Sequence, residues 1–144
     1  MIDIVNSAVQ AVAAGAGVVF NAPRVKTGCT VRHETGTSRF VLLKPGVYHV
    51  LFVGNIAIPT GGAVGEIDVG LSVDGDVVEG TEAAYTPAAV DVYGNVTVAA
   101  LVRVYGCNGC GANVGVSVVN TSDAAINVRD ANLIIDRRCG GDAV

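Results

Sequence analysis

Charged and aromatic residues are scarce in this sequence. Charged residues account for 15% of the 144 positions and aromatic residues for 5%, and tryptophan is absent. Disordered segments combine low hydrophobicity with high net charge, whereas 51% of this chain is hydrophobic and its formal charge is -4. Polar residues or glycine interrupt every apolar run before it could span a membrane, and leucine, glutamate and lysine are too few for a coiled coil. The composition therefore excludes a disordered tail, a coiled coil and a transmembrane protein.

Basic residues are also few, with 9 lysine and arginine residues against 13 aspartate and glutamate residues. The longest basic run is the pair Arg137 and Arg138. A nucleic-acid-binding protein needs a positive stripe or an aromatic stacking platform, so we expect no nucleic-acid partner. The first residues lack the basic and apolar regions of a secretory signal. We therefore expect synthesis in a cytoplasm and no insertion into a membrane.

Alternating apolar and polar residues predict β-strands along most of the chain. The pattern covers residues 46–59, 66–73, 76–79, 96–105, 114–118 and 126–135, with shorter apolar runs at 18–20, 29–33 and 39–43. Turn signals recur about every ten residues, which is typical of a sandwich or barrel. Residues 7–14 offer the one short helical pattern. The sequence predicts an all-β, antiparallel β-sandwich that forms a single domain over residues 1–144.

Two local signals refine this prediction. Asp74-Gly75 follows a strand and favours a type I′ hairpin turn, because both central residues of that turn need positive φ. In the last strand the apolar positions change parity between Val128 and Ala131. One extra residue near Arg129–Asp130 accounts for the change, which predicts a β-bulge.

The strand at residues 46–59 is apolar on both of its faces. Successive side chains of a strand point to opposite sides, so Tyr48, Val50 and Phe52 share one face. Val47, His49, Leu51 and Val53 share the other face. A monomer would expose this second face as an apolar patch. We therefore expect it to be covered by another chain.

Several motifs follow one another along nearly the whole chain. They are VAAGAGVVF at residues 12–20, FVLLKPGVY at 40–48, LSVDG at 71–75, VGVSVVN at 114–120 and ANLII at 131–135. Their order resembles that of tumour-necrosis-factor-like (TNF-like) jelly-roll domains of the bacterial and phage type, and the step Pro45-Gly-Val-Tyr48 is the most specific part. Such domains are usually homotrimers around a threefold axis. The resemblance therefore implies a homotrimer with Val47, His49, Leu51 and Val53 at its interface.

A second resemblance concerns the beginning and end of the chain. Ile-Val-Asn-Ser at residues 4–7, FNAPRVKTGC at 20–29 and Leu-Ile-Ile at 133–135 are similar to segments of small structural proteins of phages and prophages of gut Firmicutes. This similarity implies a non-enzymatic virion protein on the capsid exterior, made in the host bacterial cytoplasm. The expected role is a trimeric capsid decoration or head-fibre protein whose partner is the major capsid protein. An adhesin or surface-appendage subunit, joined by inter-subunit contacts and cysteines, is the alternative.

In the virion interpretation the N-terminal segment or the C-terminal tail holds the protein on the capsid. Residues 1–7 and 137–144 are the candidate docking arms, and the docking residues are Ile2, Ile4, Arg137 and Arg138. The loops at residues 59–65 and 82–89 are candidates for contact with a host cell-surface glycan or protein. The absence of tryptophan disfavours a lectin, and the absence of a Gly-X-Y run disfavours a stalked fibre.

The spacing Cys107-Asn-Gly-Cys110 occurs in redox and metal sites. A redox pair of this kind lies at a helix N-terminus, whereas here it is expected in a turn between two strands. Zinc needs four ligands, and the remaining cysteines, Cys29 and Cys139, are far away in the sequence. We expect reduced cysteines at this turn and no metal site; a structural disulfide is the first alternative, and Cys107 and Cys110 as metal ligands are the second.

No pattern in the sequence matches a known catalytic motif. His33 and His49 have no serine, aspartate or cysteine at motif spacing, and neither a nucleophile elbow nor a P-loop occurs. We expect His33 to be solvated and His49 to be packed and neutral on the face of the threefold axis. The acidic residues match no calcium loop. The sequence therefore predicts no enzymatic activity and no cofactor.

Overall fold

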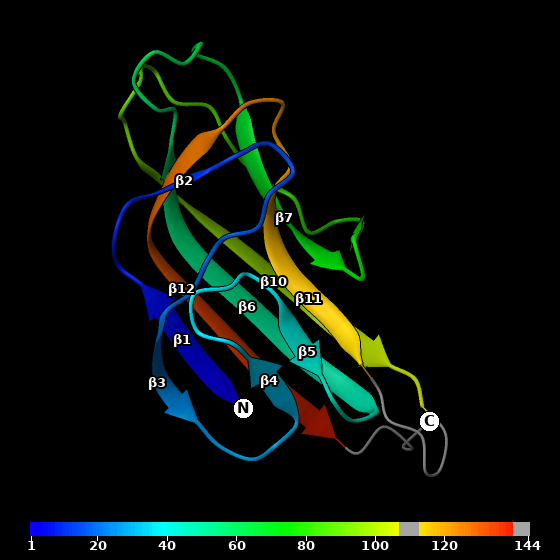
Figure 1. Ribbon diagram of the computed structural model, residues 1–144. Coiled ribbons are helices and arrows are strands. Elements are labelled where there is room, and N and C mark those ends of the chain that lie inside the picture. The colour runs from blue at the N-terminus through cyan, green and yellow to red at the C-terminus, as the bar shows by residue number, and fades with distance from the viewer. Residues whose placement is uncertain (107–112, 140–144) are drawn as a thin grey trace.

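Two six-stranded antiparallel sheets pack face to face (Figure 1). The computed structural model describes residues 1–106 and 113–139. The strands are β1 (Ile2–Asn6), β2 (Gln10–Val12), β3 (Ala22–Lys26), β4 (Val31–His33), β5 (Phe40–Leu42), β6 (Gly46–Ala57), β7 (Ile67–Val73), β8 (Asp76–Val77), β9 (Ala83–Tyr85), β10 (Gly94–Val104), β11 (Val114–Asn120) and β12 (Ile126–Cys139). The predicted all-β antiparallel sandwich is confirmed.

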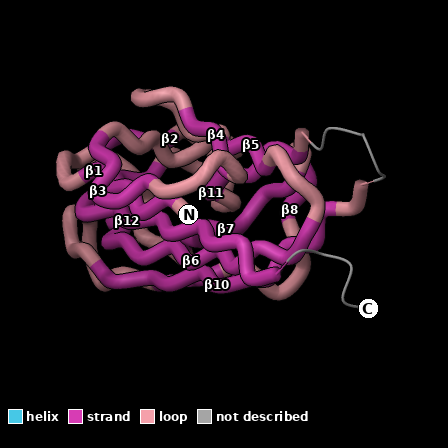
Figure 2. Tube along the Cα trace, turned by 90° about the horizontal axis from the view of Figure 1, so that it is seen from below, coloured by secondary structure: helices cyan, strands magenta, loops and turns pink. Residues whose placement is uncertain are grey.

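The strand order places the first and last strands beside each other. Sheet A has the order β10-β6-β12-β1-β3, with β2 beside β12, and sheet B has the order β4-β5-β11-β7-β8, with β9 beside β7. Figure 2 shows the same strands from below, with β10, β6 and β12 of sheet A on one side and β4 and β5 of sheet B on the other. None of the described segments forms a helix of the length and apolar character that crossing a membrane requires.

The core lies between the two sheets and follows the predicted alternation. Tyr48, Val50 and Phe52 of β6 are fully buried. The ring of Phe20 packs edge-on against Phe40 and Phe52, with ring centroids 5.7 Å and 6.3 Å away. Edge-to-face rings are favourable because the positive edge of one ring meets the negative face of another.

The predicted turn and bulge are both present. Asp74 and Gly75 have φ angles of 50° and 91° and connect β7 to β8. Strand β8 is shorter than predicted, since it ends at Val77. In β12 the register with β6 shifts between Arg129 and Asn132, and Asp130 has a φ of 51°.

Two segments differ from the sequence prediction. Residues 7–14, expected as a short helix, contain strand β2 instead, which pairs with β12. Residues 18–20, expected as a strand, lie outside the named strands; Phe20 makes an isolated bridge with Thr37, and the preceding Gly17 makes one with Val119. The reason is a side chain that replaces a neighbouring strand: the Gln10 carboxamide accepts a hydrogen bond from Val19 N and donates one to Val19 O, both at 2.9 Å.

The expected N-terminal docking arm is part of sheet A. Strand β1 pairs with β12 on one side and β3 on the other. Ile2 and Ile4 are 2% and 1% exposed, so their assignment as docking residues was wrong. They face the core because they alternate with the outward-facing Asp3 and Val5. At the other end, Arg137 and Arg138 belong to β12, and residues 140–144 lie outside the described residues.

Candidate functional site

The outward-facing side of sheet A has an apolar centre. Leu51 of β6 lies opposite Ala99 of β10 on one side and Ile134 of β12 on the other. In the next row, Val53 lies opposite Thr97. We call this surface the sheet A face; its central residues are Val47, His49, Leu51, Val53, Ala99, Leu101 and Ile134.

The sheet A face brings together the four residues that the sequence suggested for self-association. Val47, His49, Leu51 and Val53 all point outward and are half-buried. Leu101, one strand away and opposite His49, is 66% exposed. Leu101 and Ile134 were not predicted as part of this site, because their strands could not be ordered beside β6 from the sequence.

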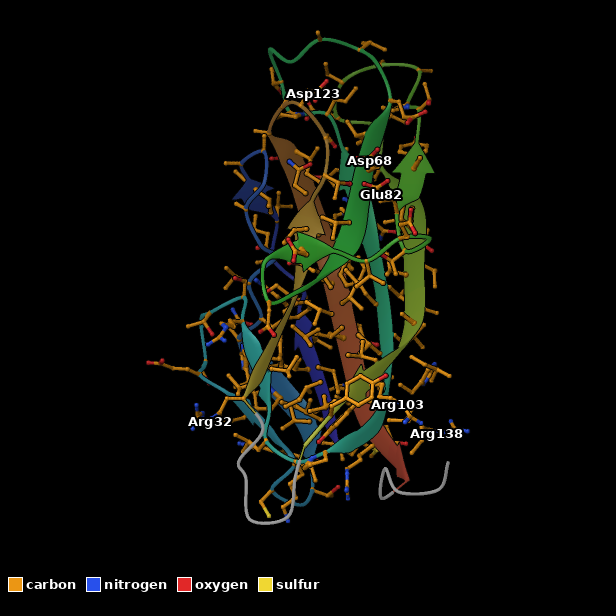
Figure 3. The ribbon with its side chains drawn as sticks, turned by 90° about the vertical axis from the view of Figure 1, so that its right-hand side faces the viewer. Arg32, Asp68, Glu82, Arg103, Asp123 and Arg138 are labelled. Carbon is orange, nitrogen blue, oxygen red and sulfur yellow. The ribbon has the colours of Figure 1, made fainter. Side chains whose placement is uncertain are left out.

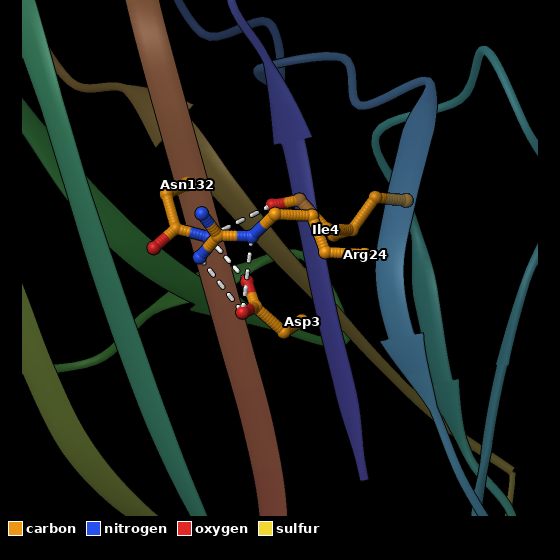
Figure 4. A network of polar contacts seen from close by, with 4 residues as sticks. All are labelled: Asp3, Ile4, Arg24 and Asn132. Atoms are coloured by element: carbon orange, nitrogen blue, oxygen red, sulfur yellow. Dashed lines mark hydrogen bonds and ion pairs between the residues drawn. The ribbon is translucent and has the colours of Figure 1, made fainter.

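A polar network borders the sheet A face along β1. Arg24 of β3 donates two hydrogen bonds to Asp3 Oδ2, at 3.2 Å and 2.8 Å (Figure 4). Asn132 Nδ2 donates to Asp3 Oδ1 at 2.6 Å and to the Ile4 carbonyl at 3.2 Å. The network therefore links β3, β1 and β12. A polar rim around an apolar centre is the usual anatomy of a protein interface.

His49 occupies the middle of this face. Its register partners are Leu101 on β10 and Asp136 on β12. The half-buried ring thus lies between an apolar residue and a carboxylate. Within the described part of the chain, no group of three or more His, Cys, Asp or Glu side chains could hold a metal ion.

The other histidine is held by packing and is not freely solvated as expected. The His33 ring stacks on Phe40 with centroids 4.0 Å apart, and its Nε2 donates to the Thr37 carbonyl at 2.9 Å. Burial lowers the pKa of His33, and the hydrogen bond to Thr37 opposes that shift only in part. His33 therefore supports the β4–β5 hairpin.

A hollow of about 790 Å³ lies over the outer side of sheet B. Its floor consists of small residues, including Ser72 of β7 and Gly115 and Ser117 of β11. The Asp74 carboxylate at its edge accepts a hydrogen bond from Gly115 N at 2.8 Å, so it braces the turn. Ser72 is 7% exposed.

Two of the four cysteines, Cys29 and Cys139, lie within the described residues. Cys107 and Cys110, the candidate metal ligands, lie outside the described residues. Cys29 is exposed in the loop after β3, and Cys139 is the last residue of β12.

The loop expected at residues 82–89 contains strand β9, whereas residues 59–65 connect β6 and β7.

Comparison with known proteins places the chain in a fold class. The Eiger TNF structure from S. frugiperda is similar, with a TM-score of 0.71 and 15% identity over 96% of this chain and 91% of that one. Murine APRIL at pH 5.0 has a TM-score of 0.60 and 11% identity over 89% of this chain and 96% of that one. The chain therefore has a TNF-like jelly-roll fold. No protein-family model and no curated protein sequence matches it.

Proposed function

We propose that the protein is a non-enzymatic structural subunit that self-associates as a homotrimer through the sheet A face. The supporting observation is the apolar centre of that face, where Leu101 is 66% exposed, opposite His49 and one row from the Leu51–Ala99 pair. Contiguous apolar patches on soluble proteins mark interaction sites. The TNF-like fold favours a second and third copy of the same chain as the occupants.

The assembly functions in a phage virion, as a decoration or head-fibre protein on the capsid exterior. This part of the proposal depends on the similarity of residues 4–7, 20–29 and 133–135 to small phage structural proteins. Its action is mechanical: trimers add contact area between neighbouring positions of the capsid, with the major capsid protein as partner. Since Ile2 and Ile4 belong to the core, capsid docking falls to exposed residues such as Arg138.

The trimer is tested by light scattering of the purified protein after size-exclusion chromatography. We expect the mass of three 14.5 kDa chains. Leu101→Asp should reduce this mass to that of one chain, because the substitution places a charge in the apolar contact. Val77→Asp is the matched control: Val77 is also exposed, at 44%, but lies on β8 of sheet B. A monomeric wild-type protein contradicts the proposal.

The virion role is tested by mass spectrometry of phage particles purified from cells that carry the gene. Peptides of this protein should co-purify with the capsid protein in a constant ratio. Their absence from particles, together with disulfide-linked ladders on a non-reducing gel, would favour the surface-appendage subunit instead.

A further inference from the structure

Positive and negative charges occupy different parts of this chain. Residues 45–102 contain no lysine or arginine. The same segment contains the carboxylates Glu66, Asp68, Asp74, Asp76, Glu79, Glu82 and Asp91. A sequence can separate its charges in this way without consequence if the fold mixes them again. In this protein the fold keeps them apart.

The connections at one end of the sandwich gather four of these seven carboxylates, Glu66, Asp68, Glu82 and Asp91. The loops before β7 and before β10 meet there, because Asp91 N donates to the Ile58 carbonyl at 2.8 Å. The loop after β11 joins them, since Thr121 N donates to the Asp68 carbonyl at 3.1 Å. Figure 3 shows Asp68, Glu82 and Asp123 toward this end. We call it the acidic end and define it by Glu66, Asp68, Glu82, Asp91 and Asp123.

The opposite end collects basic side chains. Figure 3 shows Arg32, Arg103 and Arg138 there. The β-register agrees, because Arg103 lies opposite Val47 at the start of β6. We call this the basic end and define it by Arg32, Lys44, Arg103, Arg137 and Arg138.

Side chains of the basic end are not neutralised within the described part of the chain. The ion pairs there are Arg24–Asp3 and Arg129–Asp130, and neither involves the basic end. Arg137 donates two hydrogen bonds to the Pro45 carbonyl, at 3.0 Å and 2.6 Å, and this acceptor is not a carboxylate. One carboxylate of β12, Asp136, lies at this end and opposes His49.

The two ends are too far apart to compensate each other. Strand β6 has 12 residues, which at roughly 3.3 Å per residue gives a length of about 40 Å. The Debye length at physiological ionic strength is about 8 Å. Arg129 is the exception to this separation of charges: it is a basic residue, but it lies opposite Asn55, near the acidic end. Its guanidinium lies 4.0 Å from the centre of the Tyr93 ring.

Both ends also present apolar side chains to solvent. Tyr105 at the basic end is 81% exposed, with the Arg103 guanidinium 5.7 Å from its ring centre. At the acidic end, Val64 and Val92 are 57% and 42% exposed. Tyrosine and arginine are enriched among the residues that dominate binding energy in interfaces. Each end therefore combines charge with apolar contact area.

We propose that copies of this protein bind end to end, with the basic end of one against the acidic end of the next. The acidic end of a second copy is the surface on this molecule that complements the basic end in charge. Such a contact joins two different surfaces and does not close on itself, so it generates a linear stack. The formal charge of -4 disfavours general attraction to a polyanion.

The proposed stack rests on the homotrimer proposed above, because the trimer multiplies the contacts between two ends. A threefold rotation leaves position along its axis unchanged, so three copies of each end lie at the same level in the homotrimer. The contact between two trimers is then repeated three times. Repetition matters because a single exposed ion pair is weak and linked contacts gain by effective concentration.

The proposal is tested by sedimentation velocity at about 20 mM and about 0.5 M NaCl, since only the higher concentration screens exposed charges over short distances. We expect species larger than the trimer at low salt and their loss at high salt. The high-salt mass reports on the homotrimer, and growth at low salt reports on the ends. A high-salt monomer that still grows at low salt would overturn the trimer alone.

Charge reversal at each end gives the sharper test. The basic-end variant combines Arg32→Glu with Arg138→Glu, and the acidic-end variant combines Glu66→Lys with Asp123→Lys. Each variant alone should lose stacking, with association at least about tenfold weaker. An equimolar mixture should recover it, because every contact between the two variants again joins opposite charges. Loss in both variants without recovery in the mixture would overturn the proposal.

A matched control separates the ends from the net charge. Asp76→Lys with Glu79→Lys changes the net charge as much as the acidic-end variant but lies on β8 and the turn after it. This control should stack like the wild type. Wild-type protein that binds a short DNA duplex at low salt through Arg32 and Arg138, without self-association, would assign the basic end to a polyanion and overturn the proposal.

Discussion

Replacing Asn120 by alanine is expected to destabilise the end of β11 by about 3 kcal/mol. The Asn120 side chain is fully buried. Its Nδ2 donates to the Val12 carbonyl at 3.1 Å and to the Ala124 carbonyl at 2.9 Å, and its Oδ1 accepts from Ser122 N at 2.9 Å. Each hydrogen bond contributes about 1 kcal/mol net, and more where its partner stays buried and unpaired.

Urea unfolding at fixed protein concentration measures this loss. With an m-value of about 2 kcal/mol/M, the midpoint should fall by about 1.5 M urea. Asn95→Ala is the matched control, since the exposed Asn95 makes one surface hydrogen bond, to Asn55 Oδ1 at 3.2 Å. The control should change stability by less than about 0.5 kcal/mol. Equal losses in the two variants would refute the argument from burial.

Asn120→Asp separates the donor bonds from side-chain size. The aspartate keeps an acceptor for Ser122 N but directs its second oxygen at the carbonyls of Val12 and Ala124. Like partial charges then face each other in a buried site, so this variant should lose at least as much stability as the alanine variant. Wild-type stability in Asn120→Asp would show that the two donor bonds contribute nothing.

Further predictions concern the hairpin, the core and the border network. Burial lowers the pKa of His33 below 6.5. As the pH falls, the unfolded chain therefore binds the proton before the folded protein does, and the free energy of unfolding should decrease below about pH 6.5. His33→Gln should remove that part of the pH dependence of urea midpoints. Gly54→Ala places a Cβ 2.7 Å from the buried ring of Phe52 and should cost about 1–3 kcal/mol by thermal or urea unfolding; unchanged stability would show that the ring can move freely. Asp3→Ala should cost less than about 1 kcal/mol from its ion pair, because the Arg24 side chain is 58% exposed; a double-mutant cycle with Arg24→Ala measures the coupling.

Local patterns carried most of the information about the strands. The alternation at β6 fixed which side chains face the core, since Tyr48, Val50 and Phe52 are buried as expected. The parity change in β12 located the bulge at Asp130. These features depend on neighbouring residues, so a single sequence contains the signal.

Features that depend on distant partners could not be predicted in the same way. The assignment of Ile2 and Ile4 as docking residues was wrong because their burial requires pairing with β12, more than a hundred residues later. The backbone of Val19 is paired by the Gln10 side chain, and no sequence pattern identifies such a substitution for a strand.

The candidate site likewise combines residues that a local pattern predicts with residues that only the strand order brings together. Four of its residues follow from the two apolar faces of one strand. The inclusion of Leu101 and Ile134 required the order β10-β6-β12. The separation of charge is visible in the sequence as a segment without lysine or arginine, but its meaning depends on which loops meet at one end of the sandwich.

Two kinds of self-contact are proposed for this molecule, and salt acts on them in opposite directions. Sodium chloride screens the contact between charged ends, whereas sulfate, which is excluded from protein surfaces, strengthens apolar burial such as that of Leu101 on the sheet A face. At high sulfate concentration, screening removes the end contacts while the apolar contacts persist. Leu101→Asp should therefore lower the mass of the high-salt species, whereas Asp123→Lys at the acidic end should leave it unchanged.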